Sequence, residues 1–175
     1  MGDGDGDRGE PEEPDLATVY RFARSLRREL SGDIGGATAE LDRAIAVLPE
    51  SDPMRVRAMI RAQQAYLAVL RGDLAAAEAA LVEARASMSP VVRLAEFPVG
   101  RADAWLTAAR GHRVEAQTRL AETARECERL GQVTLALAAW ILRIDEFQQA
   151  VSRVGARLRR SPKGTPKGVR PGSDR

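Results

Sequence analysis

Cysteine and histidine are almost absent from this chain, which contains only Cys127 and His112. A single cysteine excludes a disulfide framework within the chain. A metal site needs several ligating side chains, and nucleophilic catalysis needs a base beside the nucleophile. His112 occupies a turn position, and Cys127 lies between Glu126 and Glu128, which disfavour a thiolate. We therefore expect no enzyme activity, no cofactor and no bound metal.

Long apolar runs are also missing, since no run approaches the roughly 20 residues of a membrane helix. The N-terminus is acidic and lacks the basic and then apolar layout of a signal peptide. We therefore expect a cytoplasmic protein without a membrane segment. Aromatic residues make up only 4% of the chain, and Val, Ile and Thr are sparse. The 30 alanines, together with abundant Leu, Arg and Glu, favour helices and predict an all-α protein.

Three turns of the chain share one pattern, in which Gly is followed by Ala at the fifth place and Leu at the ninth. The turn glycines Gly32, Gly72 and Gly111 lie 40 and 39 residues apart. The small and apolar residues that follow them are Ala37, Leu41 and Ala44, then Ala77, Leu81 and Ala84, then Ala116, Leu120 and Ala124. A period of this length is typical of stacked two-helix units. We predict an α-solenoid of antiparallel helix pairs, with about seven helices, over residues 15–158.

Small side chains at matched places have a packing explanation. Alanine at the fifth and twelfth places lets the two helices of a unit approach closely, and leucine at the ninth fills the groove between units. The third long helix contains Pro98 and Gly100, and we expect a kink or a break near Phe97, because proline removes a helical hydrogen bond.

Charge is segregated at the two ends of the chain. Residues 1–15 hold seven acids against Arg8, a net of −6, and residues 153–175 hold eight bases against Asp174, a net of +7. Both ends are rich in Gly and Pro, so we predict a disordered acidic leader at 1–14 and a disordered basic tail at 159–175. A solvated tail is the favoured interpretation, because no aromatic residue is interleaved for base stacking. The alternative is a nucleic-acid-associated regulator whose tail neutralises phosphates.

The repeated residues resemble tetratricopeptide repeats. The matching positions are Ser25, Gly32, Ala37, Leu41, Ala44 and Pro49 in one copy and Ala65, Gly72, Ala77, Leu81, Ala84 and Pro90 in the next, with a weaker third copy. The large aromatic residue expected early in each first helix is replaced by Arg21, Arg61 and Gly100. The period is also longer than the usual 34 residues of that repeat.

The stretch from Arg101 to Phe147 resembles the helical-repeat region of actinobacterial LuxR-type (MalT-like) transcriptional regulators. The resembling segments are Ala102-Asp-Ala-Trp-Leu-Thr-Ala-Ala-Arg-Gly111 and Leu130-Gly-Gln-Val-Thr-Leu-Ala-Leu-Ala. In such regulators the repeats resemble a sensor or partner-binding arm between an ATPase and a DNA-binding domain. The sequence has no G-x-x-x-x-G-K-[ST] phosphate loop and no length for a DNA-reading domain. We therefore expect a free-standing relative or a piece of a longer regulator.

The resemblance implies a non-catalytic scaffold that binds a protein or peptide, with small-molecule effector binding as a further alternative. Two ladders of residues mark the candidate binding groove: Arg21, Arg61 and Arg101 at a spacing of 40, and Leu26, Tyr66 and Trp105 at 40 and 39. Aromatic residues beside arginines carry binding energy at interfaces, so Arg61, Tyr66, Arg101 and Trp105 are the candidate partner-binding residues. The competing interpretation, which we favour, places both aromatic rings in the core and leaves the arginines solvated.

The last helical segment carries an apolar stripe. Trp140, Ile144, Phe147 and Val151 are spaced by four, three and four residues. Terminal repeats normally need a polar outer face, and exposed apolar patches usually mark a partner site. We expect Trp140, Ile144 and Phe147 to pair with a second copy of the chain or with a missing continuation of a parent protein.

Overall fold

The computed structural model describes residues 14–141, and these residues form seven helices and no strand. The helices are α1 (Pro14–Leu30), α2 (Ile34–Val47), α3 (Val56–Arg71), α4 (Leu74–Ala86), α5 (Glu96–Ala109), α6 (Arg113–Arg129) and α7 (Val133–Ile141). The prediction of an all-α protein with about seven helices is confirmed. The predicted end of the repeat domain at residue 158 and the basic tail lie outside the described residues, as does the leader up to residue 13.

In each pair, a glycine and the residue after it form the turn between the two helices. The turn glycines with positive φ are Gly32 (82°), Gly72 (83°) and Gly111 (97°). Only glycine adopts this conformation without a steric penalty. Asp33 then accepts a hydrogen bond from the Gly36 backbone N–H at 2.8 Å, and Asp73 accepts one from Ala76 at 3.0 Å. Each carboxylate therefore caps the helix that begins beside it.

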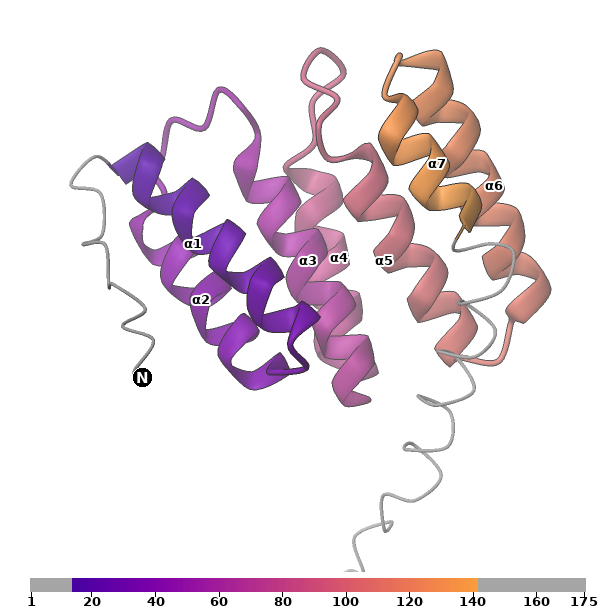
Figure 1. The fold of residues 1–175 in the computed structure, drawn as a ribbon, viewed down its shortest axis with the longest axis horizontal. Coiled ribbons are helices and arrows are strands. Elements are labelled where there is room, and N and C mark those ends of the chain that lie inside the picture. Colours follow the sequence, from indigo (N-terminus) through magenta and orange to yellow (C-terminus); the bar gives the residue numbers. More distant parts are fainter. Residues whose placement is uncertain (1–13, 142–175) are drawn as a thin grey trace, which may run out of the picture.

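The helices pack as consecutive pairs, α1 with α2, α3 with α4 and α5 with α6, and α7 packs against α6. Figure 1 shows these pairs side by side in chain order. Successive pairs meet mainly through α2 and α3, and then through α5 against both α3 and α4. The arrangement agrees with stacked helix pairs, whereas the regular rotation between pairs that a solenoid requires remains a prediction.

The matched alanine and leucine positions are buried in all three pairs. Each of these nine side chains is at most 2% exposed. They are Ala37, Leu41, Ala44, Ala77, Leu81, Ala84, Ala116, Leu120 and Ala124. At the positions seven residues before the turn glycines, Ser25, Ala65 and Ala104 are also at most 1% exposed. Small side chains at the helix contacts therefore do allow the close approach that the sequence predicts.

The α5 helix shows what proline and glycine do in the third pair. The helix begins at Glu96 and continues unbroken through Pro98 and Gly100, so the expected break within the helix is wrong. Pro98 lies in the first turn, where a backbone N–H has no helical acceptor. A Cβ atom on Gly100 would clash with the Thr123 side chain of α6. Glycine at this place therefore permits close contact between α5 and α6.

Candidate binding grooves between the even-numbered helices

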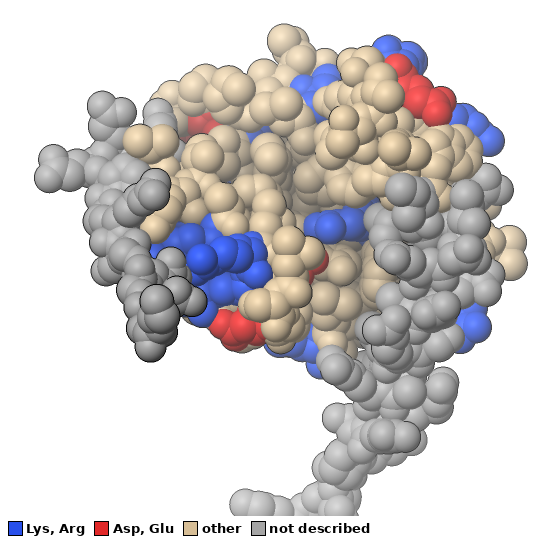
Figure 2. Space-filling model, in the orientation of Figure 1, with Lys and Arg blue, Asp and Glu red and all other residues tan. Residues whose placement is uncertain are grey.

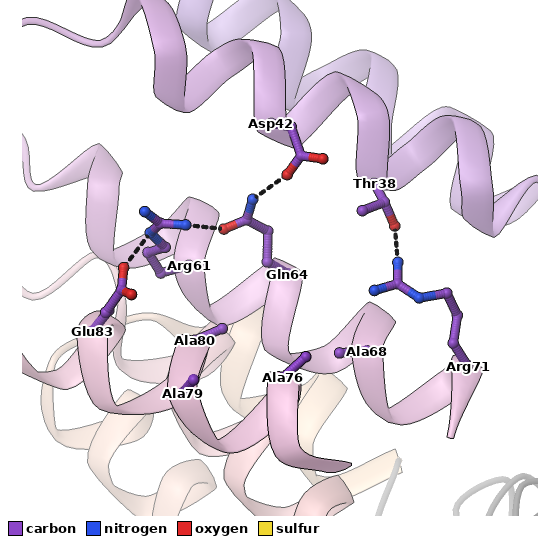
Figure 3. A pocket seen from close by; sticks show the side chains of 10 residues that line it. All are labelled: Thr38, Asp42, Arg61, Gln64, Ala68, Arg71, Ala76, Ala79, Ala80 and Glu83. Carbon is purple, nitrogen blue, oxygen red and sulfur yellow. Dashed lines mark hydrogen bonds and ion pairs between the residues drawn. The ribbon is translucent and has the colours of Figure 1, made fainter. Parts of the chain in front are cut away.

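A groove with a volume of about 330 Å³ lies between α2 and α4, above α3 (Figure 3). We refer to it as groove 1. Both even-numbered helices face α3, and the small side chains along the groove leave the space between them unfilled. These side chains are Ala68, Ala76, Ala79 and Ala80. The groove is thus a consequence of the same alanine-rich packing that joins the helices of a pair.

A chain of polar contacts crosses groove 1 from α2 to α4. Gln64 Nε2 donates a hydrogen bond to Asp42 Oδ1 at 2.8 Å, and Arg61 donates one to Gln64 Oε1 at 3.0 Å. The Arg61 Nε atom also lies 2.8 Å from Glu83 Oε2 (Figure 3). The three helices therefore present a cation, an amide and two carboxylates around apolar methyl groups.

At the other end of groove 1, Arg71 of α3 donates a hydrogen bond to the Thr38 hydroxyl of α2. The charged groups of the lining balance, because Arg61 and Arg71 stand against Asp42 and Glu83. These side chains place hydrogen-bond donors and acceptors around the groove. A peptide needs both, because its backbone N–H groups donate and its carbonyl groups accept.

A second groove with a volume of about 300 Å³ lies between α4 and α6, above α5. We refer to it as groove 2. Its lining is Arg85, Met88, Glu96, Val99, Gly100, Glu122, Thr123 and Glu126. Arg61 in groove 1 and Gly100 in groove 2 each stand eleven residues before a turn glycine (72 − 61 and 111 − 100). Both grooves therefore lie between even-numbered helices of consecutive pairs, but groove 1 extends from this level toward the turn and groove 2 extends toward the opposite end of the helices.

Carboxylates dominate the lining of groove 2, and arginines beside it hold one of them charged. Glu126 Oε1 lies 2.6 Å from both Arg129 and Arg93. Hydrogen bonds from Arg129 are the main cause that lowers the pKa of Glu126 from 4.5 to about 2, with Arg93 adding to the effect. Arg85 pairs with Asp103 of α5 at 2.8 Å. Groove 2 is therefore bordered by ion pairs, and arginines hold the Glu126 carboxylate in its charged form.

Three of the four predicted groove residues come together, but mostly inside the protein. The rings of Tyr66 and Trp105 meet edge to face, with centroids 5.3 Å apart. The Arg101 guanidinium lies over the Tyr66 ring at 4.1 Å from its centroid. Trp105 is only 4% exposed, and burial raises the pKa of the Tyr66 hydroxyl. The aromatic pair therefore joins α3 to α5 inside the protein, as the core interpretation expects, whereas Arg101 packs on Tyr66 and is not left solvated.

Arg61, the fourth predicted residue, lies apart from this cluster and lines groove 1. Arg61 and Tyr66 are five residues apart on α3, which places them about 140° apart around the helix axis. The 40-residue ladder of arginines also mixes two helix faces. Arg101 stands ten residues before its turn glycine, whereas Arg61 stands eleven before its own (111 − 101 and 72 − 61). A shift of one residue turns a side chain by about 100°.

A polar link between the odd-numbered helices, which the sequence did not predict, is formed by Gln63. Gln63 of α3 is 1% exposed; its Nε2 donates to Glu29 of α1, and its Oε1 accepts from Arg101 of α5. One amide thereby connects three helices. The only signal in the sequence is a glutamine within the apolar stripe of α3, which does not reveal where its partners lie.

The predicted terminal apolar face lies largely outside the described residues, which end before Ile144 and Phe147. Trp140 is within them and is partly buried. Its Nε1 donates a hydrogen bond to Glu128 Oε1 of α6 at 2.7 Å. The indole thus packs α7 onto α6, and pairing through this end of the protein remains a prediction.

Cys127 and His112 are the two residues considered above for nucleophilic or base catalysis. Cys127 is fully buried, and burial is the main cause that raises the pKa of its thiol. His112 is exposed in the turn before α6, with Nδ1 at 4.0 Å from Glu115. Within residues 14–141, no group of three His, Cys, Asp or Glu side chains could hold a metal ion. None of the described helices is both long and apolar enough to cross a membrane.

Comparisons of the chain with protein-family models, with curated proteins and with solved structures find no match.

Proposed function

We propose that this protein is a non-catalytic scaffold that binds a protein or peptide segment across the two grooves. The supporting observation is that grooves 1 and 2 lie between the even-numbered helices of consecutive pairs, meet at one level of the helices, and each combine apolar side chains with charged ones. A recurring surface suits an extended ligand, because each repeat contacts the next stretch of the same chain. The grooves are also open to solvent along one side, whereas most small-molecule sites enclose their ligand.

The role we propose in the cell is the interaction or sensor arm of a transcriptional regulator. This part of the proposal depends only on the resemblance of Arg101–Phe147 to the repeats of LuxR-type regulators. The basic tail, on which the nucleic-acid alternative depends, lies outside the described residues. The grooves therefore make peptide binding the better supported function.

The test is a selection of random displayed peptides against the full chain, followed by affinity measurements with two alanine variants. Ala79 and Ala75 are both exposed on α4, but only Ala79 lines groove 1. Ala79→Phe should fill groove 1 and weaken the selected peptides at least ten-fold, whereas Ala75→Phe should leave their affinity unchanged.

Groove 2 offers a matched pair of its own. Glu122 lines the groove and Arg125, also exposed on α6, does not. Glu122→Ala should weaken peptides that cross both grooves, and Arg125→Ala should not. The proposal fails if no peptide binds more tightly than about 100 µM. It also fails if the groove variants and their controls behave alike.

A further inference from the structure

The two grooves differ in the balance of charge along their walls. In groove 1 two arginines stand against two carboxylates, and each of these four side chains has a hydrogen bond or an ion pair with another residue of the lining. Groove 2 is lined by three carboxylates, Glu96, Glu122 and Glu126, and by one cation, Arg85. The lining of groove 2 therefore has a net charge of −2 (1 − 3).

Two of the three carboxylates in groove 2 are already paired with arginines from outside the lining. Arg93 contacts both Glu96 and Glu126, and Arg129 contacts Glu126 as well. These contacts fix the two carboxylates in place at the mouth of the groove. They also satisfy much of the charge of Glu96 and Glu126, so a ligand gains less from these two groups.

Glu122 is the carboxylate that groove 2 leaves for a ligand. Its side chain is exposed, and it forms no hydrogen bond or ion pair with the described part of the chain, residues 14–141. The one arginine of the lining, Arg85, is held by Asp103 of α5 at 2.8 Å. Glu122 and Glu126 are four residues apart on α6 and share one face of that helix. A cation that enters groove 2 therefore meets an unpaired carboxylate beside a paired one.

The walls of groove 2 also provide apolar contacts. Val99 belongs to the apolar core that the second and third pairs share, and the partly buried Met88 packs against it. Gly100 adds no side chain to the lining. The groove volume of about 300 Å³ is at the lower end of the roughly 300–1,000 Å³ of ligand pockets, which suits one long side chain. Lys and Arg bury their methylene stems along apolar surface and keep the charged end in polar surroundings.

The acidic character of groove 2 is a local feature of the molecule. The chain as a whole has a net charge of +2. Figure 2 shows Lys and Arg side chains gathered over α1, with few acidic side chains on that face. Within the first pair, one carboxylate lies among several guanidiniums. Glu40 of α2 is 1% exposed and lies 3.4–3.6 Å from Arg21, Arg24, Arg28 and Arg43. A cationic ligand is therefore attracted to groove 2 and not to the surface in general.

We propose that groove 2 binds a Lys or Arg side chain of the peptide ligand, with the stem against Met88 and Val99 and the charged end beside Glu122. This inference rests on the proposed function, because it names the side chain that the peptide places in one of the two grooves. Groove 1, whose charges balance, does not discriminate between basic and acidic side chains. The protein therefore selects peptides with a basic residue at one position.

The first test is the composition of the peptides that bind. Random displayed peptides selected against the full chain should carry Lys or Arg at one position at least twice as often as the unselected library. Selection against Glu122→Gln should lose this enrichment. Selection against Glu50→Gln should keep it, because Glu50 is an exposed carboxylate that lines neither groove.

This selection separates the inference from the proposed function on which it rests. Peptides that Ala79→Phe weakens but that carry no basic position overturn the inference and leave peptide binding in place. If no peptide binds the chain, the proposed function and the inference fail together. An enrichment that Glu50→Gln removes as well as Glu122→Gln would reflect the overall charge of the chain, and it would also overturn the inference.

A charge exchange tests the contact itself, with affinities measured by fluorescence anisotropy at about 50 mM NaCl. Replacing the selected basic residue by Gln should weaken binding to the native chain about three-fold or more, as expected for a partly exposed ion pair. The same replacement should change the affinity for Glu122→Gln by less than about 1.5-fold. At about 0.5 M NaCl the loss in the native chain should shrink, because the screening length falls to roughly 4 Å.

The reversed pair completes the exchange. Glu122→Lys should weaken the basic peptide more than Glu122→Gln does, and a peptide with Glu at the selected position should bind Glu122→Lys more tightly than it binds the native chain. Among residues 14–141 Glu122 has no contact of this kind to lose, so these variants should unfold like the native chain. Equal losses from the Gln peptide in the native chain and in Glu122→Gln, or no preference of Glu122→Lys for the acidic peptide, would overturn the inference.

Discussion

The first and third helix pairs flank the second pair in the same order, but different contacts join them to it. The third pair shares an extended apolar core with the second, which includes Trp105, Leu106 and Val69. The first pair meets the second over a smaller cluster of α2 and α3 residues, which includes Leu41 and Ile60. The main contact of the first junction is between α2 and α3, whereas α3 and α5 pack directly at the second.

The comparison shows that helix pairs of the same arrangement can have two kinds of interior, one aromatic and one charged. In a stacked array, stability is roughly the sum of each unit and its contact with the next. The second junction gains from large buried aromatic surface, and the first pair instead buries the charge of Glu40 among arginines. Buried ion pairs contribute little net stability compared with apolar packing of similar size. We therefore expect the third pair to be held more tightly than the first.

The largest expected effect is at the second junction. Trp105→Ala should lower the free energy of unfolding by about 3–5 kcal/mol, because the indole is 4% exposed and leaves a cavity. Phe22→Ala, at the partly buried edge of the first junction, should cost only about 1–2 kcal/mol. Urea unfolding of the full chain measures both. A loss below about 1 kcal/mol for Trp105→Ala would contradict a core role for the indole and would favour the alternative that Trp105 lines an exposed groove.

The next effect concerns the charged interior of the first pair. Glu40→Gln should lower the free energy of unfolding by about 1–3 kcal/mol, because four guanidiniums lose their shared anion. Glu83→Gln provides the control, since Glu83 pairs with Arg61 but is 56% exposed. Its loss should stay below about 1 kcal/mol. If the two variants lose the same amount in urea unfolding, burial of Glu40 has no energetic role.

A smaller effect distinguishes the turn of the third pair from the other two. His112 has φ −88° and ψ 62°, close to the −80° and 72° of Asp33, but it makes no side-chain cap. His112→Asp should therefore raise the free energy of unfolding by about 0.5–1 kcal/mol, and Asp73→Ala should lower it by about 1 kcal/mol. Thermal unfolding at pH 7 provides the measurement. No gain from His112→Asp would mean that the third turn does not tolerate the cap.

The smallest effect is the dependence of stability on acid. The pKa of Glu126 is lowered from 4.5 to about 2, so its contribution is complete above pH 4.5 and is lost as the pH falls toward 2. The pKa of Asp33, in the first pair, is also lowered, by hydrogen bonds from the Gly36 backbone and Arg28. The free energy of unfolding, measured between pH 6 and pH 2, should depend less steeply on pH in Glu126→Gln and in Asp33→Asn than in the native chain. An unchanged slope in both variants would contradict this origin.

The sequence predicted the local elements well because their causes are local. Glycine followed by aspartate forms a turn and a helix cap at Gly32 and again at Gly72, where an alanine-rich helical segment follows. Alanine and leucine at matched places predicted the buried faces without knowledge of the neighbouring helix. Pro98 misled the prediction, because the same residue breaks a helix interior but suits a first turn. Only the position of the helix start distinguishes the two cases.

The candidate sites were harder to predict, because they depend on residues far apart in the chain. Arg61 and Arg101 looked equivalent at a spacing of 40, but the change from 40 to 39 between turns places them on different helix faces. Nothing near Glu40 in the sequence shows that α1 would supply three of its four arginine neighbours. The alanines of groove 1 likewise looked identical to those of the core.

By itself, the amino-acid sequence determined the helices, their turns and the small residues along which they pack, because these follow from backbone preference and periodicity within one or two turns. The tertiary structure alone decided which charged side chains meet, which aromatic rings become core and where the two grooves lie. Those outcomes depend on the rotation of each helix about its own axis, and a single residue of offset changes that rotation by about 100°.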